Sequence, residues 1–78
     1  METIQVRINK GLTLEQLFSQ QREEFPYHGD SVLLFDLLTV AKEMGKPFKR
    51  NELNKCIRKQ VEDKLDERTK ENLKELLI

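Results

Sequence analysis

The segment VLLFDLLTVAKEM, residues 32–44, decides the fold, because apolar side chains occupy nine of its positions. A helix that is apolar on nearly all sides is usually a central helix that several other elements contact. Asp30 or Ser31 is suited to cap its beginning. Gly45 is suited to a left-handed C-terminal cap, and Pro47 prevents continuation of the helix. We therefore predict a core helix over residues 32–44.

Two further helices are predicted after the core helix. The first begins near Arg50 or Asn51, and its apolar stripe has helical spacing. That stripe consists of Leu53, Cys56, Ile57, Val61 and Leu65. Asp66 is suited to cap the second helix. The apolar face of the second helix consists of Thr69, Leu73, Leu76 and Leu77.

One helix is predicted before the core helix. Thr13 and Gln16 have the spacing of a capping box, in which each side chain bonds to the backbone N–H of the other residue. Pro26 ends the helix, because proline disfavours helical geometry at the residue before it. The prediction is a helix over residues 14–25, followed by a loop.

The N-terminal segment has a different periodicity. Ile4, Val6 and Ile8 alternate with polar residues, and a period of two predicts a short strand over residues 3–9. A single strand has no partner within one chain, and an exposed strand edge tends to pair with another chain. We therefore predict either a homodimer formed through this strand or a weakly held arm.

These elements give the fold class, which is mainly α. We predict a small four-helix domain with a short N-terminal strand. The chain has 78 residues, a length that allows one domain and excludes two. Residues 1–29 are expected to hold the strand and the first helix, and residues 31–77 a three-helix core.

Several classes of protein are excluded by composition. The chain has one cysteine, so no internal disulfide is expected. No apolar run approaches the roughly 20 residues that a membrane-spanning helix needs. The first residues lack the positive and apolar segments of a signal peptide. We expect a cytoplasmic protein without a membrane partner.

Candidate catalytic and metal-binding residues are few. His28 lies beside Tyr27 and two residues from Asp30, which allows an acid–base interpretation. A loop histidine without a partner is the favoured interpretation. One His and one Cys do not make a zinc site, which needs at least three protein ligands. We predict no catalytic residues, no metal site, no cofactor and no enzymatic activity.

Charge is distributed unevenly along the chain. The whole sequence has 14 basic and 14 acidic residues, yet residues 42–59 hold seven Lys or Arg and two Glu, a net charge of +5. A basic stripe on a neutral protein attracts phosphates or an acidic protein surface. A solvated helix face with ordinary ion pairs is the equally weighted alternative.

The order of the last three predicted helices resembles the three-helix core of winged-helix and related helix-turn-helix DNA-binding domains. The resemblance covers residues 31–77 and does not include the wing. It rests on the motif GKPF at residues 45–48, followed by Glu52 and Leu53, which joins the core helix to the next helix. It also rests on Arg68, Thr69, Leu73 and Leu76 in the last helix. It implies that the last helix enters the major groove. The groove-facing residues would be Arg68, Thr69, Lys70 and Asn72.

A second resemblance concerns the other end of the chain. A strand followed by helices is similar to ribbon-helix-helix repressors, which dimerise through the strand and read the major groove with it. The residues that this resemblance places in the groove are Thr3, Gln5 and Arg7.

The sequence therefore predicts a small non-enzymatic regulatory module, and nucleic-acid binding is favoured over protein binding as its function. The alternative is a protein-interaction module, an adaptor or inhibitor, with an acidic protein partner. For both, the predicted contact residues are Lys46, Lys49, Arg50, Lys55, Arg58, Lys59, Arg68, Thr69, Lys70 and Asn72.

Overall fold

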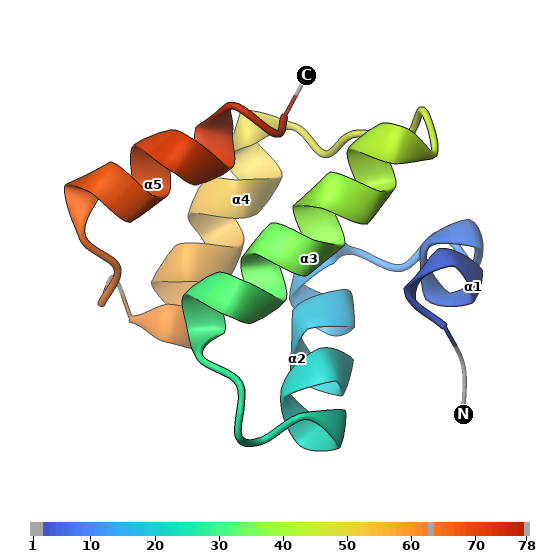
Figure 1. Cartoon of the computed structure of the whole chain (residues 1–78), viewed down its shortest axis with the longest axis horizontal. Helices are drawn as coiled ribbons and strands as arrows, with labels where there is room; N and C mark the ends of the chain where they lie inside the picture. The colour runs from blue at the N-terminus through green and yellow to red at the C-terminus, as the bar shows by residue number, and fades with distance from the viewer. Residues whose placement is uncertain (1–2, 63, 78) are drawn as a thin grey trace.

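The structure, a computed structural model, describes residues 3–62 and 64–77, and over these residues it is all-α (Figure 1). Its elements are α1 (Ile4–Asn9), α2 (Leu14–Glu24), α3 (Asp30–Glu43), α4 (Arg50–Cys56), a π-helical turn (Ile57–Val61) and α5 (Glu67–Lys74). No helix in the described part of the chain is long and apolar enough to cross a membrane.

Helix α3 is the central helix, as its apolar sequence predicts. Helices α1, α2 and α5 all contact it, and α4 contacts α2 (Figure 1). The buried side chains of α3 are Leu33, Leu34, Leu37, Leu38 and Ala41. The molecule measures only 16 Å along its shortest axis. The outer side of α3 is therefore not covered, and Val32 and Phe35 remain about half exposed.

Local signals define most helix ends. The Thr13–Gln16 capping box is present at the start of α2. Asp66 caps α5 by accepting a hydrogen bond from the Thr69 N–H at 2.8 Å. Gly45 adopts a left-handed conformation with φ of 74°. The predicted N-cap of α3, Asp30 or Ser31, is wrong, because the N-cap is Gly29, which supplies no side-chain hydrogen bond.

The predicted strand over residues 3–9 is wrong, because this segment forms α1. Thr3 caps the helix by accepting a hydrogen bond from the Val6 N–H at 3.2 Å. Ile4 and Ile8 lie one helical turn apart and pack inward, whereas Val6 is 45% exposed. A helix satisfies its backbone hydrogen bonds internally, which a single strand cannot do. The strand-paired homodimer and the ribbon-helix-helix resemblance lose their structural basis.

Arg7 attaches α1 to α2. Its guanidinium donates to Gln21 Oε1 and forms an ion pair with Glu24. The side chains of Arg7 and Glu24 are 12% and 14% exposed. Gln21, a polar residue on the inner face of α2, is therefore the acceptor for a cation from the neighbouring helix.

The π-helical turn continues α4 and keeps the first four residues of the predicted apolar stripe facing inward, whereas the fifth, Leu65, lies outside any helix and is only partly buried. Its buried side chains, Ile57 and Val61, follow Leu53 and Cys56 of α4. Arg22 of α2 donates to the backbone oxygen of Gln60 at 2.8 Å. This hydrogen bond fixes the turn against α2.

Cys56 is expected to react slowly with thiol reagents in the folded protein. The side chain is fully buried, and burial raises the pKa of its thiol to about 12. The reactive thiolate is therefore scarce at neutral pH and shielded from solvent. Labelling followed by mass spectrometry should be slow in buffer and fast in denaturant, and fast labelling of native protein would contradict this assignment.

Candidate nucleic-acid interface

The outer face of α4 and its π-helical extension carries a group of exposed cations. Leu53, Cys56 and Ile57 fix this segment with one side against the core. The opposite side therefore faces solvent. In the described residues, its five cations are exposed and have no ion pair or side-chain hydrogen bond. We call them the α4 cations: Lys49, Arg50, Lys55, Arg58 and Lys59.

One hollow lies between the α4 segment and the beginning of α2. Lys55, Lys59 and Gln60 line it from one side. From α2 and its cap, the lining residues are Thr13, Glu15, Gln16 and Ser19. Two cations and one carboxylate therefore meet in this hollow, together with neutral hydrogen-bonding side chains.

A second hollow lies on the other side of the α4 segment, against α5. Asn54, Ile57 and Arg58 line it from α4 and the π-helical turn. Glu67, Lys70 and Lys74 line it from α5. Lys70 Nζ lies 3.8 Å from Glu67 Oε1, and Lys74 Nζ lies 3.4 Å from Glu71 Oε1. The hollow thus combines three cations with Glu67, and Lys74 is a member that the sequence prediction missed.

The structure does not bring all predicted contact residues together. Lys46 donates to Asn9 Oδ1 at 2.7 Å and so lies against the end of α1. Arg68 is exposed on α5. Thr69 and Asn72 lie on the α3 side of α5, away from the hollow that Arg58 and Lys70 share.

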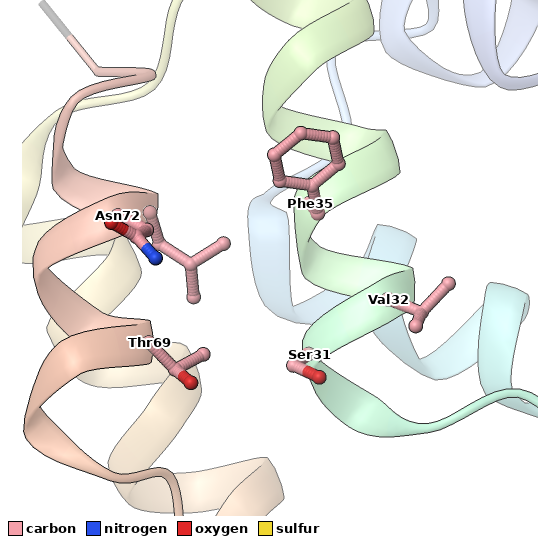
Figure 2. Close-up of a pocket in the computed structure, with 6 residues that line it drawn as sticks. Ser31, Val32, Phe35, Thr69 and Asn72 are labelled. Carbon is pink, nitrogen blue, oxygen red and sulfur yellow. The ribbon is translucent and has the colours of Figure 1, made fainter.

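Thr69 and Asn72 line an apolar hollow with residues of α3 (Figure 2). Phe35, Val32 and Ser31 lie on α3, across from these two side chains (Figure 2). Leu73, the sixth lining residue, is buried. Sequence reasoning placed every apolar residue of α3 in the core and therefore missed this hollow.

The residues considered for acid–base chemistry do not gather around a shared site. The His28 ring stacks on Phe25, with ring centroids 5.3 Å apart. Tyr27 is 97% exposed. Asp30 accepts a hydrogen bond from Arg22 at 3.2 Å. In residues 3–62 and 64–77, no three His, Cys, Asp or Glu side chains are arranged to hold a metal ion.

Comparison of this chain with models of protein families, with curated proteins and with solved structures found no match.

Proposed function

We propose that this protein is a small non-enzymatic regulatory module that binds nucleic acid. The observation that carries the proposal is the set of five exposed α4 cations without protein partners. Two cations of α5, Lys70 and Lys74, form ion pairs with carboxylates of the same helix. The α4 cations form no such ion pair in the described residues, although Glu15 and Glu67 line the hollows beside them, so phosphates can bind these cations and release bound counterions. The proposal also draws on the resemblance of residues 31–77 to helix-turn-helix domains.

Binding to duplex DNA is expected to weaken steeply as salt concentration rises. Each neutralised phosphate contributes close to one unit to the slope of log affinity against log salt. The double variant Lys49→Gln/Arg50→Gln should reduce that slope by up to about two. Both residues are exposed at the start of α4, so its unfolding curve should match that of the unmodified protein. Fluorescence anisotropy over a salt series measures the slope.

The matched control is Lys10→Gln/Lys42→Gln, which removes two positive charges at the end of α1 and on α3. This control should keep the slope of the unmodified protein. Equal losses in both double variants would show that only total charge matters and would contradict an interface on α4. Absence of binding at low salt would overturn the nucleic-acid proposal itself.

A protein-interaction module remains the second candidate, and the apolar hollow between α3 and α5 favours it. Val32 and Phe35 are 48% and 50% exposed. Half-exposed apolar side chains around a hollow suit a partner that inserts an apolar side chain there. An interface of this kind does not need the steep salt dependence that phosphate binding requires. The salt series therefore separates the two candidates.

A further inference from the structure

We propose that α4, not α5, is the helix that reads base edges in the major groove of duplex DNA; this inference rests on the proposed nucleic-acid function. An outward stripe with spacing i, i+3 and i+4 lies on one face of this helix, and it continues at i+7 into the π-helical turn. The stripe consists of Asn51, Asn54, Lys55 and Arg58. All four are exposed, and their side chains form no hydrogen bond within the described residues.

The chemistry of this stripe suits base edges better than phosphates alone. An asparagine amide can bond to both N6 and N7 of adenine, and an arginine can bond to O6 and N7 of guanine. Asparagine adds no charge that attracts phosphates, and it is a poor helix former. The side chains of Asn51 and Asn54 are exposed and uncharged and form no hydrogen bond in the described residues, so neither a folding contact nor attraction to phosphates explains asparagine at these two positions. Base contacts would account for both.

The surroundings of α4 fit a helix that lies in the major groove, between the phosphate backbones of the two strands. Hollows lie on both of its sides, so the segment forms a ridge, and a major groove admits one α-helix. Lys55 and Lys59 line the hollow toward α2. Arg58, Lys70 and Lys74 line the hollow toward α5. The flanking cations outside the stripe, Lys59 on one side and Lys70 and Lys74 on the other, can reach the phosphates of the two strands while the stripe faces the bases.

Helix α5 is less suited to enter the groove, although the helix-turn-helix resemblance assigns it that role. Three carboxylates, Glu67, Glu71 and Glu75, are exposed on or directly after this helix. Carboxylates repel the phosphates that border the groove. The amide of Asn72, a base-reading candidate in that resemblance, lines the apolar hollow beside α3 (Figure 2). The structure thus assigns α5 to the flank of the interface.

Selection of binding sequences from a pool of random short duplexes tests this assignment. Affinities are then measured for the selected sequences and for their single-substituted versions. The unmodified protein should select a site that contains at least one A·T pair. Asn54→Ala or Asn51→Ala should lower discrimination at one such pair by roughly tenfold. Because asparagine is neutral, non-specific affinity and the salt slope should stay unchanged. Asn72→Ala, the matched control on α5, should keep the selectivity of the unmodified protein.

Loss of selectivity in Asn72→Ala but not in the two α4 variants would overturn the assignment and favour α5. Salt-dependent binding without any selected sequence would also overturn it, while leaving the proposed nucleic-acid function intact. Absence of binding to every duplex at low salt would overturn both. Circular dichroism of each variant separates lost recognition from lost folding. The spectra should match that of the unmodified protein, because all three asparagines are at exposed positions.

Discussion

Leu37→Ala is expected to lower the free energy of unfolding by about 2–5 kcal/mol. Leu37 is fully buried in α3, the helix that α1, α2 and α5 contact. Truncation removes apolar surface from the core and leaves a cavity that three surrounding helices cannot all move to fill. A domain of this size has a total stability of roughly 5–10 kcal/mol, so this one substitution removes a large part of it.

Urea unfolding followed by far-ultraviolet circular dichroism measures this loss. The matched control is Phe35→Ala on the same helix, where the side chain is 50% exposed. Because half of the Phe35 surface already contacts water, the control should lose less stability than Leu37→Ala. A control that loses as much would contradict the orientation of α3, which places Leu37 in the core and Phe35 at the surface.

The parts of the fold that the sequence predicts correctly depend on interactions between near neighbours. The capping box of Thr13 and Gln16 spans three residues, and the left-handed Gly45 needs only its own backbone geometry. The centre of α3 is identified by the density of apolar residues. Each of these signals is complete within one short segment, so no knowledge of the tertiary structure is needed to interpret it.

The N-terminal segment shows where such reasoning fails. Ile4, Val6 and Ile8 fit a strand by alternation, but Ile4 and Ile8 also fit one face of a helix because they are four residues apart. Six residues are too few to distinguish the two periods. The contacts of Arg7 with Gln21 and Glu24 favour the helix, and these residues are at least 14 positions away. A local pattern contains no information about them.

The candidate site was predictable in part for the same reason. A charge count locates the cations near α4 without any structure. The count cannot show that Lys46 lies against α1, that Lys74 joins Arg58, or that α5 turns Asn72 toward α3. These placements depend on how the helices pack. The spacing of Asn51 and Asn54 was visible in the sequence, but only the exposed face of α4 distinguishes this stripe from other polar positions.

Arg7→Met is expected to lower the free energy of unfolding by about 2–3 kcal/mol. This loss is smaller than the loss on breaking a fully buried ion pair, because the side chains of Arg7 and Glu24 retain some contact with water. The substitution keeps an apolar chain of similar length in place. It leaves the Glu24 carboxylate and Gln21 without their cationic partner at a site where each is largely buried. Lys74→Met, which breaks an exposed ion pair on α5, is the matched control and should cost under about 1 kcal/mol.

A second substitution tests whether the unpaired carboxylate is the cause. Adding Glu24→Gln to Arg7→Met removes the buried negative charge, so the double variant should be more stable than Arg7→Met alone. The two losses should then be clearly non-additive, as expected for residues in contact. Additive losses, or a loss in Arg7→Met no larger than in Lys74→Met, would show that α1 is not attached through Arg7. The inward packing of Ile4 and Ile8, together with the hydrogen bond from Lys46 to Asn9, would then account for the position of α1.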